Sequence, residues 1–193
     1  PEMDGSLPEH EVMPGGTFVY EFDAEPFGLH LYHCHAAPLK RHLHKGLYGV
    51  FIVDPKTPRP PADEMVMVMN GFDTNFDSDN EVYAVNTVAN HFMHAPIRVR
   101  VGELVRVYLV NLTEFDLLNS FHLHGIFFAV SRTGTSLAKT ETTDTVMLCQ
   151  GERAILETRF RYPGQFMFHA HQSEFAELGW MGMFLAEGTR RDT

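Results

Sequence analysis

The sequence predicts an all-β protein built as a Greek-key β-sandwich. Its apolar segments are short and rich in aromatic and β-branched residues, and turn residues such as Gly, Pro and Asp separate them. No long segment has the 3.6-residue periodicity of an amphipathic helix. Hydrophobic residues make up 44% of the 193 positions, so the chain can bury a core.

The predicted strands follow one another along the chain, each with its own signal. Residues 17–22 alternate and are rich in aromatic and branched side chains. Residues 47–53 form an apolar run that Asp54-Pro55 ends. Four further apolar segments predict strands at 97–101, 104–110, 154–160 and 181–185. The first two of these flank Gly102-Glu103, which is typical of a hairpin turn.

A proline-rich segment, residues 55–61, divides the chain into unequal parts. About 130 residues follow it, enough for a complete sandwich, whereas the roughly 55 residues before it hold three or four strands. Half a sandwich leaves an open edge and an uncovered face. We therefore expect residues 1–56 to be the C-terminal half of a domain, 57–64 a linker and 65–193 a complete domain. The missing half would be lost, supplied by another chain or absent from this sequence.

Composition excludes several classes of partner. The net charge of −10 and a pI of about 5.6 argue against nucleic acid and anionic membranes. No apolar run reaches the roughly 20 residues that span a bilayer. No signal peptide is present, although a chain that begins at Pro1 could have lost one. Two cysteines make no disulfide framework; Cys149 is expected to be a small buried residue, with a Cys34–Cys149 disulfide as the alternative.

One histidine pattern occurs twice. Gly28 stands five residues before His33-Cys34-His35, and Gly164 stands five residues before His169-Ala170-His171, which indicates two related domains. A third pair is His122-Leu123-His124. Alternate residues on a strand point to the same face, so both imidazoles of a pair can reach one metal cluster. Three such pairs exceed the need of a single metal ion and predict a multinuclear site.

Cys34 begins a second metal-binding pattern. His42 and then Gly46-Leu47 follow it within about a dozen positions, which is the loop layout of a blue-copper site with a weak axial ligand. Leu47 stands where a methionine often stands, and because leucine cannot donate to copper it should raise the reduction potential. We interpret His44 as an exposed or supporting residue. The alternative is a buried cysteine among ordinary histidines.

These patterns resemble the multicopper oxidases, most closely the bacterial two-domain, laccase-like branch built from cupredoxin domains. The resemblance covers nearly the whole chain, and the segments that carry it are 32–35, 46–49, 121–125 and 169–179. It implies copper as the cofactor, about four ions per functional unit: one type 1, one type 2 and a type 3 pair.

The resemblance also implies a role for each candidate ligand. Type 1 copper would take Cys34 and His42, with Leu47 at the axial position. The three-copper centre would take His122 at type 2 copper and, at the type 3 pair, His33, His35, His124, His169 and His171. In the family this centre uses eight histidines. The other two, and the second type 1 histidine, come from the first half of domain one.

Two acids are candidates for proton delivery by the same resemblance. Asp4 matches an acid near type 2 copper, with a turn residue before Gly5 as the alternative. Glu174 follows the last histidine pair, with a solvated loop acid as the alternative. The resemblance also implies that the second domain has lost its own type 1 site to packing, because other residues stand at the four positions that the family would use: Asn119, Ala170, Phe175 and Trp180.

The resemblance implies a laccase-like oxidase that couples oxidation of phenols or similar donors to reduction of O2 to water. It further implies a homotrimer with the three-copper centre between subunits, in the periplasm or secreted. The alternatives are a metallo-oxidase of Cu(I), Fe(II) or Mn(II), a copper nitrite reductase, and a non-catalytic copper or electron-transfer protein. His91 and His94 have the wrong spacing for strand ligands and are expected on a surface loop.

Overall fold

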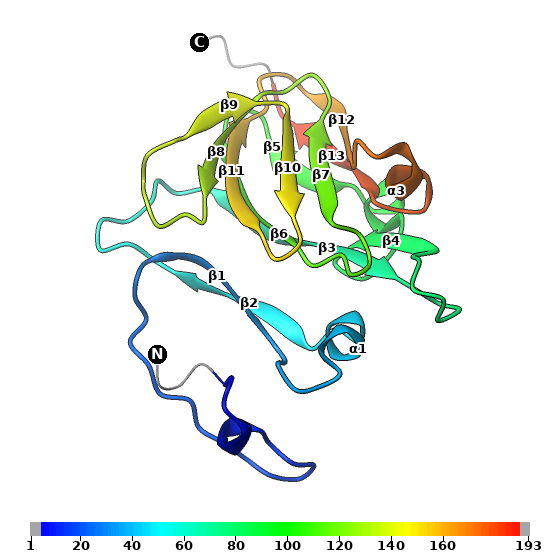
Figure 1. The fold of residues 1–193 in the computed structure, drawn as a ribbon. Coiled ribbons are helices and arrows are strands. Elements are labelled where there is room, and N and C mark those ends of the chain that lie inside the picture. Colours follow the sequence, from blue (N-terminus) through cyan, green and yellow to red (C-terminus); the bar gives the residue numbers. More distant parts are fainter. Residues whose placement is uncertain (1–4, 190–193) are drawn as a thin grey trace.

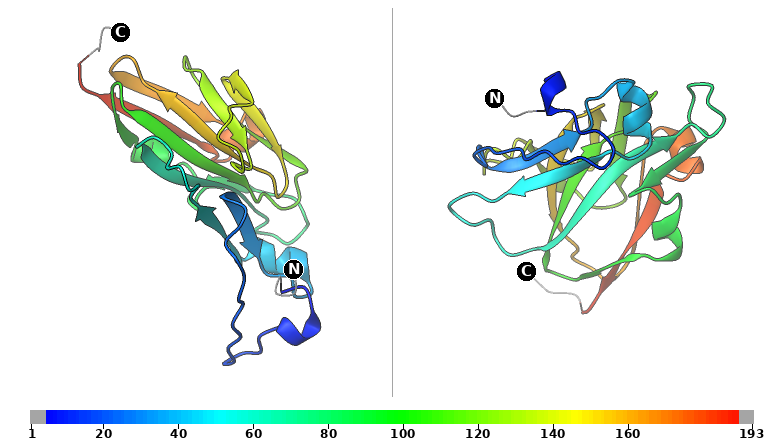
Figure 2. Two further views of the ribbon diagram at one scale, coloured as in Figure 1. Left: turned by 90° about the vertical axis from the view of Figure 1, so that its left-hand side faces the viewer. Right: turned by 90° about the horizontal axis from the view of Figure 1, so that it is seen from below.

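The computed structural model describes residues 5–189 and confirms the all-β sandwich. Two large sheets pack face to face, and a β-hairpin lies against the outer face of one of them (Figures 1 and 2). The hairpin is β1 (Gly28–His33) with β2 (Tyr48–Val53). The five-stranded sheet has the order β10 (Thr145–Cys149), β7 (Leu118–Leu123), β12 (Gly164–His169), β13 (Met181–Glu187), β5 (Ile97–Arg100).

The second large sheet has six strands. Their order is β4 (Val82–Val85), β3 (Asp63–Phe72), β6 (Leu104–Asn111), β11 (Arg153–Arg159), β8 (Phe128–Arg132), β9 (Glu141–Thr143). The helices of the described residues are short: η1 (Pro8–His10), α1 (Leu39–His44), α2 (His91–His94), α3 (Ser173–Glu177). None of them is long and apolar enough to cross a membrane.

Five of the six predicted strands are confirmed, as β2, β5, β6, β11 and β13. The expectation for residues 17–22 was wrong, because they form neither helix nor strand. Their side chains Val19 and Phe22 are 73% and 58% exposed, and no strand pairs with them within residues 5–189. An alternating segment becomes a strand only where a partner satisfies its backbone groups.

The repeat seen in the sequence reappears in the backbone. Gly28 begins β1 with φ of 143°, and Gly164 begins β12 with φ of 144°. Side-chain-bearing residues rarely adopt this region, and a Cβ on Gly28 would also approach the Thr133 carbonyl oxygen within 2.8 Å. Each glycine therefore sets the start of a strand that ends in the histidine pattern.

The core lies between the two large sheets. On β6, Val105, Val107 and Leu109 face this core, whereas Tyr108 and Val110 face the hairpin. Leu29 of β1 is fully buried against this second face, with its N–H donating to the Thr133 carbonyl oxygen at 2.8 Å. The hairpin is thus docked on the six-stranded sheet. The predicted domain boundaries at 56 and 64 stay a prediction.

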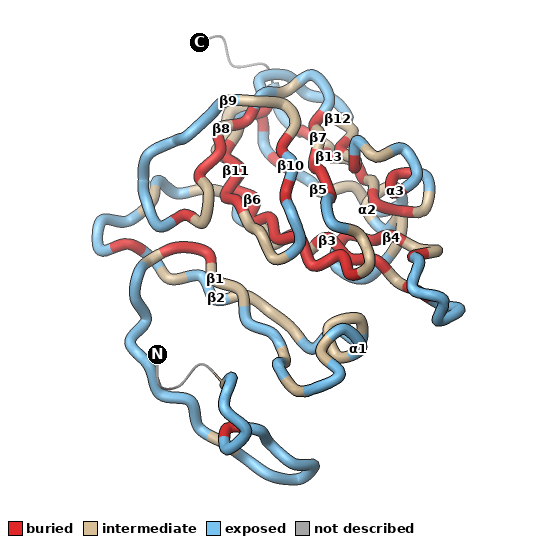
Figure 3. The backbone as a smooth tube through the Cα atoms, viewed as in Figure 1, coloured by how far each residue is buried: buried red, intermediate tan, exposed pale blue. Residues whose placement is uncertain are grey.

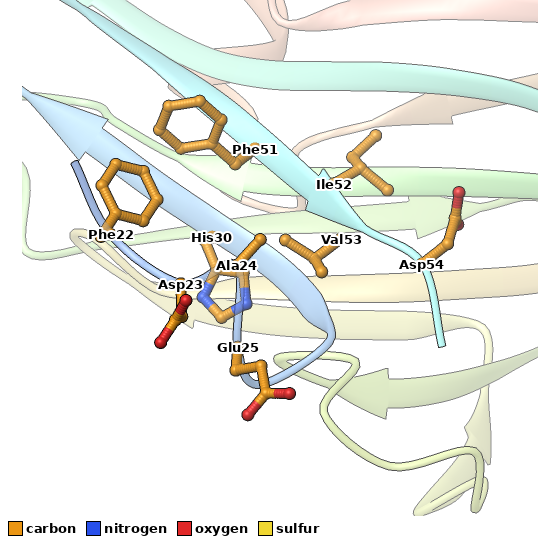
Figure 4. A pocket seen from close by; sticks show the side chains of 9 residues that line it. All are labelled: Phe22, Asp23, Ala24, Glu25, His30, Phe51, Ile52, Val53 and Asp54. Atoms are coloured by element: carbon orange, nitrogen blue, oxygen red, sulfur yellow. The ribbon is translucent and has the colours of Figure 1, made fainter. Parts of the chain in front are cut away.

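The hairpin's opposite face is uncovered within the described residues (Figure 3). Tyr32 and Phe51 are 49% and 47% exposed and their rings lie 4.8 Å apart, with Phe22 beside Phe51. An open pocket of about 640 Å³ lies on this side, and Figure 4 shows His30 among its lining residues. Such a face is what half a sandwich exposes.

A buried ionic network fixes the linker to the six-stranded sheet. The Arg106 guanidinium is 2% exposed; its Nε donates to Glu157 Oε1 at 2.6 Å and it donates to the Pro60 carbonyl oxygen at 2.9 Å. Arg106 also pairs with Glu64, whose carboxylate accepts a hydrogen bond from the Tyr108 hydroxyl at 2.9 Å. Every charge in the network has a partner, as burial requires.

Replacing Tyr108 with phenylalanine should remove part of the protein's sensitivity to alkali. Burial first, and then the hydrogen bond to Glu64, raise the pKa of Tyr108 to about 12. A tyrosine in the unfolded chain ionises near pH 10. The protonated Tyr108 hydroxyl therefore contributes its full stabilisation of the folded state below pH 10, and this contribution is lost as the pH rises towards 12. We expect wild type to lose about 2 to 3 kcal/mol more than Y108F across this range. Urea unfolding from pH 9 to 12 measures it, and parallel losses in the two proteins would contradict the assignment.

Candidate metal centre

The chain returns on itself to bring Cys34, His42 and Leu47 together. Cys34 follows the end of β1, and α1 carries His42 back beside it, with Cys34 Sγ 3.3 Å from His42 Nδ1. The Cys34 N–H donates to the Leu47 carbonyl oxygen at 2.8 Å, and the Leu47 N–H donates to that of His42 at 3.2 Å. A sulfur and an imidazole nitrogen this close can bind one metal ion, and the pair suits copper.

The two cysteines are both free, so the alternative of a Cys34–Cys149 disulfide is wrong. The expectation that Cys149 is buried is also wrong. On β10 the side chains alternate, with Val146 and Leu148 buried and Met147 and Cys149 exposed. Cys149 therefore ends the strand on its solvent side.

His33 and His35 flank Cys34 and are exposed. Their rings stack with centroids 6.0 Å apart. His33 Nδ1 lies 2.8 Å from the Cys34 carbonyl oxygen, which can only accept, so Nδ1 carries the proton. This leaves Nε2 of His33 with a free lone pair for a metal ion.

Four further histidines converge where β7 and β12 pair. His122 lies opposite His169 in the antiparallel register, and the ring centroids of His122 and His169 are 5.3 Å apart. The His124 ring lies 5.0 Å from that of His169, and the His171 ring 5.1 Å from that of His122. One ring nitrogen from each of His122, His124 and His169 lies within 4.8 Å of the others, a spacing that suits metal binding.

The neighbouring strand fixes the orientation of His122. Thr145 lies opposite it in the β10–β7 register, and His122 Nδ1 is 2.8 Å from Thr145 Oγ1 and 3.0 Å from the Asp144 carbonyl oxygen. The Thr145 hydroxyl donates to Asp144 Oδ1 at 3.0 Å, so it accepts from His122. Nδ1 of His122 therefore carries the proton and Nε2 is free. Burial is the main reason that the pKa of His122 lies below its usual value. The lowered pKa favours the neutral imidazole, which is the form that binds a metal ion.

Replacing Thr145 with valine should weaken metal binding by about 10- to 100-fold, because the loss of a residue that orients a ligand has effects of that size. Titration of the metal-free chain with Cu²⁺ measures the change. Thr142→Val, an exposed threonine on β9, is the matched control. Equal affinities for the two variants would show that the Thr145 hydroxyl does not orient the ligand.

One proton lies between the Nε2 atoms of His124 and His169, in a hydrogen bond that joins the two rings. His169 Nδ1 lies 2.6 Å from the Ala170 carbonyl oxygen, so it donates there and Nε2 is an acceptor. His124 Nε2 lies 2.9 Å from His169 Nε2 and must carry the proton between them. A cation that replaces this proton would meet two imidazole lone pairs, and imidazole ligands suit copper. The donor set therefore fits the metal that the resemblance implies.

The six predicted cluster histidines form two groups rather than one. His33 and His35 lie with Cys34 at the end of the hairpin, and His122, His124, His169 and His171 lie where the adjacent strands β7 and β12 end. Among residues 5–189, none of the ring contacts joins the two groups. Within these residues the six histidines therefore form two separate groups.

Asp4 and Glu174 are the two candidates for proton delivery. Asp4 lies outside the described residues. Glu174 lies in the first turn of α3 and is exposed, and no hydrogen bond joins its side chain to the four histidines within residues 5–189. Both roles stay predictions.

The other histidines have supporting or surface positions. His44 is half-buried and links α1 to the second domain: its Nε2 lies 3.1 Å from the Asp73 carbonyl oxygen and its ring packs near Phe72 and Phe115. His91 and His94 are exposed, as expected, but they lie on the short helix α2 and not on a loop.

The positions where the second domain would hold its own type 1 copper are packed. Ala170 and Trp180 are fully buried, and Phe175 stacks on Tyr83 with ring centroids 4.0 Å apart. Asn119 is also fully buried and donates to Thr113 Oγ1 at 3.1 Å. Their burial agrees with the expectation that they serve packing.

Comparisons with known proteins match nearly the whole chain. One multicopper oxidase family model matches residues 58–189 and a second matches residues 1–58. A copper-containing nitrite reductase of Neisseria gonorrhoeae is 31% identical over 91% of this chain and 49% of its own length. The chain spans about half the length of the curated relatives it matches over most of its own length.

Solved structures are also similar. A multicopper oxidase crystal structure is 60% identical with a TM-score of 0.87, over 89% of this chain and 61% of that one. The blue copper oxidase of Nitrosomonas europaea is 27% identical with a TM-score of 0.76, over 91% of this chain and 60% of that one.

Proposed function

This chain belongs to the two-domain, cupredoxin-like multicopper oxidases, a family of copper oxidoreductases, and from that premise we propose that it acts as a laccase-like oxidase. Its donors would be phenols or similar small molecules, and its acceptor O2, which is reduced to water. The observation that carries the proposal is the number of converging imidazoles. Four meet at β7 and β12, and two more flank Cys34.

The chain's own residues would divide the work between two sites. When bound, the coppers supply the one-electron chemistry. Cys34 and His42 would hold the electron-accepting copper, and Leu47 beside them would offer it no side-chain donor atom. The peptide bonds from Cys34 to His33 and His35 provide a short covalent path between the two sites. The unprotonated Nε2 atoms of His33, His122 and His169 are oriented by the hydrogen bonds on their Nδ1 atoms. Asp4 and Glu174 would hold protons for water formation.

The separation of the two histidine groups supports assembly from several copies. In a homotrimer, His33 and His35 of one subunit could meet the four sandwich histidines of the next, so that the three-copper centre lies between subunits. The uncovered hairpin face supports a further segment that completes domain one and supplies the remaining histidines. We place the protein in the periplasm or outside the cell, where a copper oxidase of this kind would meet O2 and its donor.

Copper counting on the intact assembly tests the proposal. We expect about four coppers per unit, a strong blue absorption band and an EPR-silent pair, together with O2 uptake when a phenol is added. Two coppers per unit, with nitrite reduction and no O2 uptake, would reject it.

A copper nitrite reductase is the second candidate, favoured by the 31% identity to the Neisseria gonorrhoeae protein over 91% of this chain. It needs a mononuclear catalytic copper, so some of the converging histidines would be surplus. A metallo-oxidase of Cu(I), Fe(II) or Mn(II) would differ from the leading proposal only in its donor, which O2 uptake with each ion would reveal.

A further inference from the structure

The Ser120 hydroxyl occupies an unusual place beside the histidine cluster. On β7 the side chains of Phe121 and Leu123 enter the core, so Ser120, His122 and His124 share the opposite face of the strand. Ser120 is 1% exposed. A buried hydroxyl needs hydrogen-bond partners, and its partners identify what it holds.

Both partners of Ser120 come from the segment that carries His171. The His171 N–H donates to Ser120 Oγ at 2.7 Å, and the Ser120 hydroxyl donates to Gln172 Oε1 at 2.5 Å. Gln172 Nε2 lies 3.4 Å from the Leu118 carbonyl oxygen, also on β7. Three side-chain contacts thus join β7 to residues 171–172.

These contacts of Ser120 and Gln172, which we call the clasp, lie beyond the end of the β12–β7 strand pairing. The pairing of β12 with β7 ends at His169 and His122, two residues before His171. The Ala170 N–H turns to the Trp180 carbonyl oxygen on the other side, at 3.1 Å. Ser120 therefore fixes the backbone of His171 to β7, the strand that carries His122 and leads into His124.

The core side of β7 supports the same residue. The Ser120 N–H donates to Asn119 Oδ1 at 2.8 Å, and Asn119 Nδ2 donates to Thr113 Oγ1 at 3.1 Å. Both Asn119 and Thr113 are fully buried. Hydrogen bonds on the core side of β7 thus fix the backbone of Ser120, which limits how far its hydroxyl can move.

We propose that Ser120 and Gln172 are positioning residues that hold His171 in the histidine cluster, so that a metal ion beyond the His122, His124 and His169 set can bind. The inference rests on the proposed copper function. Ser120 and Gln172 contact no metal themselves; they act through the backbone of His171. Loss of the clasp should weaken the metal-binding step that uses His171 and leave the step at the other three histidines intact.

The full chain, free of metal, provides the test. We expect Ser120→Ala to speed hydrogen exchange of the His171 amide by about tenfold or more, because its buried hydrogen bond is lost. We expect a Cu²⁺ titration of the same variant to show one step weakened by about 10- to 100-fold. Ser120→Thr keeps the hydroxyl and should restore both readouts.

Ser131→Ala is the matched control, since Ser131 is also buried in a strand but its hydroxyl donates to the Ala138 carbonyl oxygen, at 3.3 Å, and not to the histidine segment. If Ser120→Ala melts much earlier than this control, Gln172→Leu, at a half-buried site, tests the clasp with less effect on folding. Unchanged exchange and unchanged titration in these variants would overturn the inference. If wild type binds no copper here, the proposed function fails, whereas the exchange of the His171 amide still decides whether Ser120 holds the segment.

Discussion

Replacing Cys34 with serine is expected to abolish the blue absorption band and to lower oxidase turnover by more than about 100-fold, beyond the loss typical of residues that only orient a ligand. Serine has nearly the same size, so the loop can keep its fold. It lacks the thiolate, however, and with it the sulfur that lies 3.3 Å from His42 Nδ1 and that would join a bound metal ion to the peptide path to His33 and His35. Visible absorption and O2 uptake with a phenol measure the two effects.

The second cysteine provides the control for this experiment. Cys149 is free and exposed at the end of β10, on the solvent side of the strand. Cys149→Ser should therefore keep the colour, the copper content and the turnover of wild type. A Cys34→Ser variant that stays blue would show that the absorbing copper binds elsewhere.

The histidine pairs were predictable because their signal is local. Strand periodicity places His122 and His124 on one face from the sequence alone, and the repeat of Gly28 and Gly164 marks corresponding strands. Which strands lie side by side is not local information. The sequence therefore predicts six histidines at one centre, whereas in one chain the structure divides them into groups of two and four.

The residues that orient the ligands were missed for the same reason. Thr145 stands 23 positions after His122, and only the β10–β7 register brings its hydroxyl to the ring. Ser120 is two residues from His122, but nothing in its neighbourhood in the sequence points to His171, 51 positions away. The error at residues 17–22 is similar, because a strand needs a partner that local pattern does not reveal.

Replacing Trp180 with alanine should cause the largest loss of stability of any change considered, about 3 to 5 kcal/mol. Trp180 is fully buried, and its ring lies 6.0 Å from those of Phe121 and Phe168 in the core between the sheets. Removing the indole leaves a cavity that surrounding side chains can fill only in part. Since domains are stable by only about 5 to 15 kcal/mol, urea unfolding should register a large shift of the midpoint.

The same substitution should disturb the metal centre through the backbone. The Trp180 carbonyl oxygen accepts the N–H of Ala170, the residue between His169 and His171, so a collapse of the cavity would move both ligands. We therefore expect weaker Cu²⁺ binding together with the lost stability. Phe127→Ala, at an aromatic residue that is 65% exposed, is the control and should change stability by less than about 0.5 kcal/mol. A Trp180→Ala protein that unfolds like this control would show that the core does not depend on the indole.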